Sequence, residues 1–121
     1  MDWWDDLWLN QSISAYISLL SLAKSFADIE GYLMTYVARG QHADALGCTH
    51  ALAGFVNDTD TVELVSEDIQ MGKGAAVMKQ LFCVLGEAKF KKCVQNFLNI
   101  NAWSVASLPQ FLIAFTNSVD L

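Results

Sequence analysis

The stretch that decides the fold is Trp3-Trp4-Asp5-Asp6-Leu7-Trp8-Leu9-Asn10-Gln11-Ser12-Ile13-Ser14-Ala15-Tyr16, near the start of this 121-residue chain. It carries three of the four tryptophans. At about 100° per residue, it opens one helix, expected from about Asp6 to Ala27, with two apolar faces. One face comprises Leu9, Ile13, Tyr16, Ile17 and Leu20, and the other comprises Trp8, Ala15, Leu19, Leu22 and Phe26. A helix that is apolar on two sides is buried, so we expect this helix to be central.

This stretch resembles the signature of the zinc-aminopeptidase family that includes aminopeptidase N and puromycin-sensitive aminopeptidase, W-W-[ND]-D-L-W-L-N-E-[GS]-F-A-[ST]-[YF]. In that family the Glu after Leu-Asn is the third protein ligand of a catalytic zinc, and an upstream H-E-x-x-H helix supplies the other two. Gln11 stands at the glutamate position here. A neutral amide oxygen is a weak metal ligand, so the resemblance implies a degenerate member whose zinc position is lost at Gln11.

The upstream histidines of the family have no counterpart in this sequence. The family places H-E-x-x-H roughly eighteen residues before its glutamate, which would fall before Met1. Only His42 and His50 are present, and neither sits in that motif. His50 belongs to Cys48-Thr49-His50-Ala51-Leu52, which looks like the family's [ST]-H-P-[IV] segment without its proline. We expect His50 to anchor a loop, because no further ligands lie at metal-binding spacing from it.

A second block resembles the same family. Residues 69–77 read I-Q-M-G-K-G-A-A-V, similar to the family's I-[ST]-Y-x-K-G-A-x-V. The block's tyrosine donates a hydrogen bond to the oxyanion that forms when the peptide carbonyl is attacked. Met71 stands at that position and has no O–H, and loss of one such donor typically costs ~10²–10³ in rate. Helical spacing predicts that Met71 fills the core together with Met78, Phe82 and Leu85.

A narrow polar stripe separates the two apolar faces of the first helix. It is made mostly of small side chains, which are Gln11, Ser14, Ser18, Ser21 and Ser25. Two interpretations remain open: the stripe lines the vestige of an active site, or it permits close helix packing, which we favour.

Periodicity predicts further helices and no convincing strand. We expect one from Asp28, as its N-cap, to about Leu46, one from Asp68 to Leu85, one around residues 90–98, and one starting at Ser107. The inner face of the last helix comprises Leu108, Phe111, Leu112, Phe115 and Val119, and Cys83 and Cys93 are expected in the core. The fold class is therefore all-α, with about five helices resembling the helical half of a thermolysin-like aminopeptidase catalytic domain. Residues 1–121 are expected to form a single domain that lacks the H-E-x-x-H portion.

Charge and composition limit the classes of partner. The net charge of −6 argues against nucleic acid, because phosphate binding needs clustered cations. Five lysines do cluster and are interpreted as a solvated helix face; they are Lys73, Lys79, Lys89, Lys91 and Lys92. The apolar content of 54% and the charged content of only 17% predict that a protein partner covers part of the surface. We expect this partner over Trp3, Trp4 and the first helix.

Targeting signals are not visible in the sequence. No uncharged apolar run reaches the ~18 residues of a membrane span, and no basic segment typical of a signal peptide opens the chain. The three cysteines form no C-x-x-C pair, which favours an intracellular, reducing compartment over a secreted one.

Two classes of function follow from these observations. In the first, the chain is a non-catalytic relative of the aminopeptidases that serves as a structural subunit, with no cofactor, because Gln11 and Met71 replace both chemical groups. In the second, the chain is a fragment or a split half of a zinc aminopeptidase that removes N-terminal residues from peptides. The sequence favours the first class, and therefore predicts that the chain is not an enzyme.

Overall fold

The computed structural model describes residues 4–54, 58–62 and 67–119, without the side chains of residues 26, 61, 62, 118 and 119. Trp3 and the side chains of Phe26 and Val119, which were assigned above, lie outside this description. The elements are a 3₁₀ turn at Trp4–Asp6, α1 at Leu7–Leu22, α2 at Phe26–Asp44, α3 at Thr59–Val62, α4 at Glu67–Leu85, α5 at Glu87–Ile100 and α6 at Leu108–Val119. The described residues contain no strand, and five of the helices exceed ten residues, which confirms the all-α prediction.

The first helix ends earlier than predicted. α1 stops at Leu22, and Ala23 adopts an extended conformation with φ −73° and ψ 133°. Ser25 caps α2, because its side-chain oxygen accepts a hydrogen bond from the backbone N–H of Asp28 at 3.3 Å. The predictions that the first helix reaches Ala27 and that Asp28 is the second N-cap are therefore wrong. Asp28 lies instead in the first turn of α2, where its carboxylate is favourable beside the free N–H groups.

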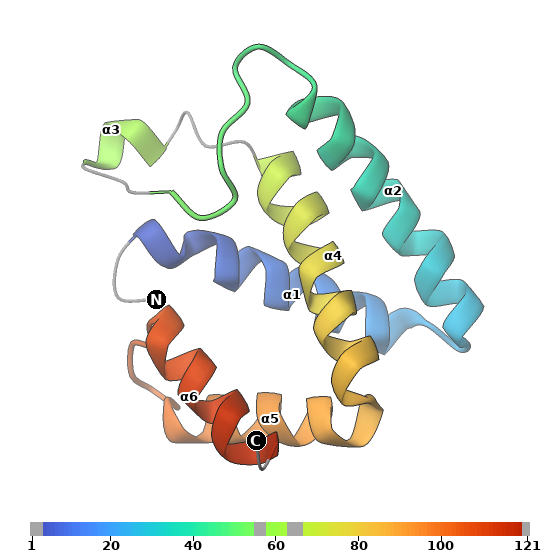
Figure 1. Cartoon of the computed structure of the whole chain (residues 1–121), viewed down its shortest axis with the longest axis vertical. Coiled ribbons are helices and arrows are strands. Elements are labelled where there is room, and N and C mark those ends of the chain that lie inside the picture. Colours follow the sequence, from blue (N-terminus) through green and yellow to red (C-terminus); the bar gives the residue numbers. More distant parts are fainter. Residues whose placement is uncertain (1–3, 55–57, 63–66, 120–121) are drawn as a thin grey trace.

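α1 lies between two groups of buried side chains. Figure 1 shows α4 crossing α1 and running beside α2, while α5 and α6 lie on the other side of α1. The larger cluster joins α1 and α4 to α5 and α6 and includes Trp8, Leu9, Tyr16, Met78, Phe90, Phe97, Phe111 and Phe115. The smaller cluster joins α1 to α2 and α4 through Ala15, Leu19, Leu33 and Ala75. The prediction that the first helix is central and buried on two sides is confirmed.

Several side chains predicted on buried faces are on the surface. Leu22, at the end of α1, is 70% exposed. Leu112 of α6 is 54% exposed, and Cys83 of α4 is also exposed, whereas Cys93 is buried as predicted. The rotation of α6 is set by aromatic packing, since the rings of Phe111 and Phe115 lie 4.3 Å apart and both are buried. With these two rings inward, Leu112 points outward.

Within the described residues, no helix is both long and apolar enough to cross a membrane.

Candidate active site

Gln11 and Met71, the two positions singled out by the sequence, lie at one helix crossing. Each is half-buried, Gln11 on α1 and Met71 on α4. The hydroxyl of Ser12 lies 3.3 Å from the backbone carbonyl oxygen of Gln70, and it also reaches the carbonyl of Trp8 one turn earlier. Ser12 and Gln70 are the sequence neighbours of Gln11 and Met71. The fold therefore brings the two family-like blocks together.

The crossing is close because glycines remove the side chains that would hold the helices apart. A Cβ added at Gly74 would lie 1.7 Å from Oγ and 2.7 Å from Cβ of Ser12. A Cβ added at Gly72 would lie 2.5 Å from the carbonyl oxygen of Tyr36 and 2.8 Å from Cα of Gly40. Two helices can approach this closely only where one of them presents bare backbone. α4 is thus held against α1 at Gly74 and against α2 at Gly72.

The four serines of the polar stripe of α1 do not make this close contact. Ser14, Ser18, Ser21 and Ser25 are exposed, and the buried Ser12 is the serine that packs against α4. The interpretation of the stripe as a packing surface is therefore wrong for its four serines. Sequence reasoning missed Ser12, although a signal was present: the family signature allows only Gly or Ser at that position.

Two serines of the stripe, Ser14 and Ser18, line a groove instead. A hollow of about 440 Å³ lies between α1 and the end of α5, and its walls include Asn10, Ser14, Ser18 and Asn101 over apolar side chains such as Phe97. The structure thus places this part of the stripe on an accessible surface.

Met71 packs differently from the prediction. It contacts the smaller cluster between α1, α2 and α4, whereas Met78, Phe82 and Leu85 belong to the larger cluster. The crossing with α1 lies between Met71 and Met78 along α4, at Gly74, so the two methionines are on different sides of it. Met71 is a packing residue as expected, but in another part of the core.

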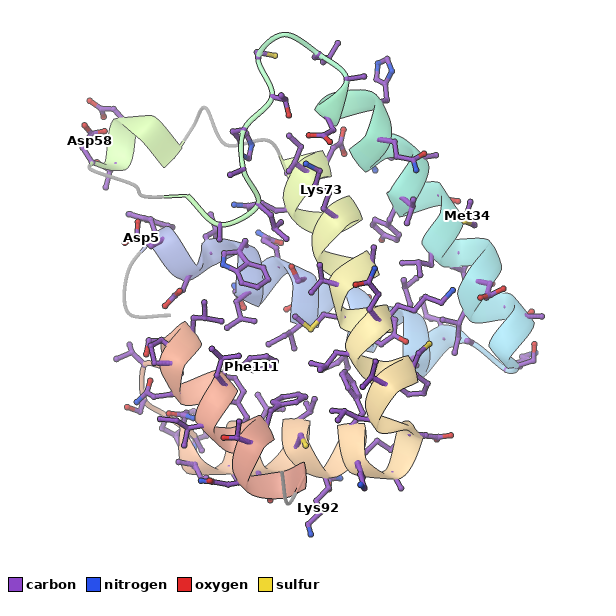
Figure 2. The ribbon with its side chains drawn as sticks, in the orientation of Figure 1. Asp5, Met34, Asp58, Lys73, Lys92 and Phe111 are labelled. Carbon is purple, nitrogen blue, oxygen red and sulfur yellow. The ribbon has the colours of Figure 1, made fainter. Side chains whose placement is uncertain are left out.

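The lysine of the second block ties α4 to the end of α2. Figure 2 shows Lys73 near that end, where its Nζ donates to Oδ1 of Asp44 at 2.5 Å. The Thr49 hydroxyl donates to the same oxygen at 2.7 Å. The hydrogen bond from Lys73, followed by that from Thr49, lowers the pKa of Asp44 below its ordinary value of 3.8. The hydrogen bond from Thr49 to Asp44 anchors the loop that follows α2.

The five lysines do not form one solvated face. Lys79 pairs with Glu30 across α4 and α2 at 2.5 Å, and Lys91 pairs with Glu87 within α5 at 2.7 Å. Lys92, in contrast, points away from the protein (Figure 2). The prediction of a single solvated face is wrong because two of the lysines, Lys73 and Lys79, bridge helices.

The described residues do not by themselves fit a catalytic zinc. No group of three or more His, Cys, Asp or Glu side chains in this part of the chain is placed to hold a metal ion. His42 is exposed in the last turn of α2, and Nδ1 of the half-buried His50 lies 2.8 Å from the carbonyl oxygen of Ala51. Gln11 contributes one neutral oxygen, whereas catalytic zinc uses three protein ligands.

The last residue of the first block is a core aromatic. Tyr16 has no exposed surface, and its ring meets those of Phe82 and Phe90 edge-on at 6.0 and 5.9 Å. Its hydroxyl and Nε1 of Trp8 are buried without a hydrogen-bond partner. Burial, with a smaller contribution from Cys83, raises the pKa of Tyr16 to about 12, so the hydroxyl stays protonated.

Two family-like blocks that meet at one crossing of a helical fold define an aminopeptidase-like domain of the metallopeptidase class. All of residues 1–121 match the sequence pattern of the family described as Peptidase family M1 domain. The chain belongs to this family.

Several similar proteins carry aminopeptidase names. The chain is 36% identical over 102 residues to probable aminopeptidase 1 of Saccharolobus solfataricus, a match that covers 82% of this chain and 13% of the relative. It is 32% identical over 131 residues to aminopeptidase N of Streptomyces lividans, covering 100% of this chain and 15% of the relative. Tricorn protease-interacting factor F2 of Thermoplasma volcanium is 28% identical over 109 residues, a match that covers 88% of this chain and 14% of the relative. The chain thus spans 13 to 15% of the length of these relatives.

The prediction that the chain is not an enzyme is contradicted by these relatives. Proteins named aminopeptidases at 30 to 36% identity point to a peptidase. The prediction rested on Gln11 and Met71, which replace both chemical groups of the family. The matched part is only 13 to 15% of the length of these relatives, so Gln11 and Met71 belong to a small part of the protein to which the names apply.

Proposed function

We propose that this chain is the helical half of the catalytic domain of a zinc aminopeptidase that removes N-terminal residues from peptides. The H-E-x-x-H portion then lies on another part of the same polypeptide or on a companion chain. The observation that carries the proposal is the crossing at Ser12 and Gln70, where the block with Gln11 meets the block with Met71. The names of the relatives support the same reaction.

In this proposal Gln11 stands at the metal-ligand position and Met71 at the tyrosine position. The carboxamide oxygen of Gln11 carries no net charge, so it holds a divalent cation more weakly than a carboxylate. The thioether of Met71 has no hydrogen to donate to an oxyanion. We therefore expect zinc to be held loosely and turnover to be slow, compared with a site that has Glu and Tyr at these positions.

We further propose that the remaining half of the catalytic domain covers the N-terminal end of α1. Trp4 is 39% exposed there, just before the helix that carries Gln11. Asp6 holds this end in place, because its Oδ2 accepts a hydrogen bond from the backbone N–H of Leu108 at 3.0 Å. The name of the tricorn protease-interacting relative also supports a role within an assembly.

The test uses the native particle, meaning the full polypeptide or the assembly in which residues 1–121 occur. We expect it to hydrolyse aminoacyl-arylamides in a reaction that a chelator stops and zinc restores. Gln11→Glu should raise zinc affinity and the rate at limiting zinc by tenfold or more, because a carboxylate replaces an amide. Gln80→Glu is the matched control, since it makes the same charge change at an exposed site on α4. A native particle without zinc-dependent hydrolysis would overturn the proposal.

The isolated chain provides a second test. Here Gln11→Glu combined with Met71→Tyr should restore no activity. The two histidines and the general-base glutamate of an H-E-x-x-H motif do not occur in residues 1–121. Metal-dependent hydrolysis by this double variant of the isolated chain would show that the other half is not needed.

A further inference from the structure

The C-terminal part of the chain has a surface without charge. No Asp, Glu, Lys, Arg or His occurs from Cys93 to Val119, although charged residues make up 17% of the whole chain. This segment comprises most of α5, the connection after it and α6 (Figure 1). Depletion of charge, together with exposed aromatic and aliphatic side chains, is typical of the core of a protein interface.

Large apolar side chains are exposed along this segment. They define a surface that we call the α5–α6 corner, made of Leu98, Ile100, Trp103, Val105, Leu112 and Ile113. Each is more than half exposed, and Ile100 reaches 76%. Single exposed apolar residues are common on proteins, but these six all fall between residues 98 and 113, where the sequence has no charged residue, and such a concentration is typical of a binding surface.

Trp103 is the residue at the corner that the chain's own packing does not explain. Its side chain is fully exposed, with a relative exposure of 106%. Its backbone has φ 61°, the left-handed region that disfavours bulky residues and that Gly or Asn adopts more readily. A strained backbone that presents a fully exposed indole is accounted for when the indole is buried by another surface.

The hollows beside the corner are also uncharged. One of about 200 Å³ lies between α5 and α6 and includes Asn96, Gln110 and Asn117 in its walls. The groove of about 440 Å³ beside α1 shares Asn101 with it. Amide groups at apolar hollows suit the backbone and uncharged side chains of a protein. The corner has no cation for an anionic lipid headgroup.

We propose that the α5–α6 corner is the surface on which the remainder of the enzyme packs, and that this remainder presents an uncharged, apolar protein surface with Trp103 at the centre of the contact. The lengths of the relatives indicate what covers this surface. The matched part is only 13 to 15% of their length, so most of each polypeptide is available to pack against the α5–α6 corner. The inference rests on the proposed function only in placing the chain inside a larger aminopeptidase.

The experiment introduces a photo-crosslinking amino acid at Trp103 in the native particle, with Val84 as the matched control. Val84 is an apolar side chain of α4 outside the corner and is 82% exposed. We expect Trp103 to crosslink to peptides beyond residues 1–121, on the same polypeptide or on the companion chain with H-E-x-x-H, at least tenfold more than Val84 does. Crosslinks to a second copy of residues 1–121, to an unrelated protein or to lipid would overturn the inference, as would a yield equal to that at Val84.

A second pair of variants checks the energetic role of the surface. Trp103→Asp should lower the thermal unfolding midpoint of the native particle or release residues 1–121 from it, whereas Val84→Asp should change neither. Equal behaviour of the two variants would contradict the inference. Aminopeptidase assays on the same samples separate the two proposals, because crosslinking without activity removes only the proposed function, and activity without crosslinking removes only this one.

Discussion

The two sides of α1 are held together by different kinds of contact. On one side, α4 touches α1 and α2 through bare backbone at Gly74 and Gly72, and ion pairs such as Arg39–Asp68 flank the contact. On the other side, α5 and α6 are joined by rings, with Phe97 and Phe111 5.3 Å apart. The glycine contact depends on the distance between backbones, whereas the aromatic contact depends on filled volume. The two sides should therefore respond in opposite ways to adding and removing atoms.

The largest expected effect is the removal of a ring from the aromatic side. Phe111 is 3% exposed and points into the protein from α6 (Figure 2). Phe111→Ala should lower the free energy of unfolding by roughly 3–5 kcal/mol, because it loses buried area and leaves a cavity. Phe111→Leu keeps most of the volume and should cost roughly 1–2 kcal/mol. Urea unfolding measures both, and equal losses would contradict volume as the controlling quantity.

The next effect is the addition of one methyl group on the glycine side. Gly72→Ala and Gly74→Ala should each lower the free energy of unfolding by about 1–3 kcal/mol, because α4 must move away from its neighbours. Gly31→Ala is the control, since a Cβ there meets nothing within 4 Å. It should stabilise the exposed face of α2 by up to about 1 kcal/mol.

A double variant distinguishes the two glycines. Ser12→Gly removes the side-chain atoms that a Cβ at Gly74 would meet, so it should recover part of the loss in Gly74→Ala. It should recover nothing in Gly72→Ala, where the clash is with the backbone of Tyr36 and Gly40. Equal recovery in both cases would show that the crossing at Ser12 is not the limiting contact.

A smaller effect is expected at Tyr16 of α1, which belongs to the larger cluster. Its buried hydroxyl has no partner, and a polar group in that state opposes folding. Tyr16→Phe removes the oxygen and keeps the ring contacts with Phe82 and Phe90. The free energy of unfolding should stay constant or rise by up to about 1 kcal/mol. A clear loss of stability would mean that the hydroxyl has a partner in solution.

The smallest effect is a pH dependence that involves Asp44 on the glycine side. The pKa of Asp44 is lowered in the folded protein by the hydrogen bond from Lys73, so its contribution is present above the ordinary value of 3.8 and disappears as pH falls through the lower folded value. Asp44→Asn should flatten the stability curve in this acid range. Glu87→Gln is the comparison: the hydrogen bond from Lys91 also lowers the pKa of Glu87, but this pair is exposed and lies within α5, so its contribution should be smaller. A larger change in Glu87→Gln would contradict a role for Asp44 in joining helices.

Local periodicity predicted much of the fold. The boundaries of α4 and the burial of α1 on two sides follow from residues within a few turns of one another, which is what helical spacing records. The break at Ala23 was missed because Ser25 competes as a cap with the apolar pattern that continues through it. Leu112 was misplaced because the rotation of α6 depends on Phe97 and Phe90, which lie on another helix.

The sequence by itself determined the helical class, the family resemblance and the identities of Gln11 and Met71 at the two chemical positions. Only the tertiary structure decided that these positions share a crossing, that Ser12 and Gly74 make it, and that the uncharged surface gathers at the α5–α6 corner. The physical reason is that periodicity reports which face of a helix is apolar. The distance between two helices depends on which residues of both helices meet at the crossing, such as Gly74 with Ser12, and no single segment reveals that pairing.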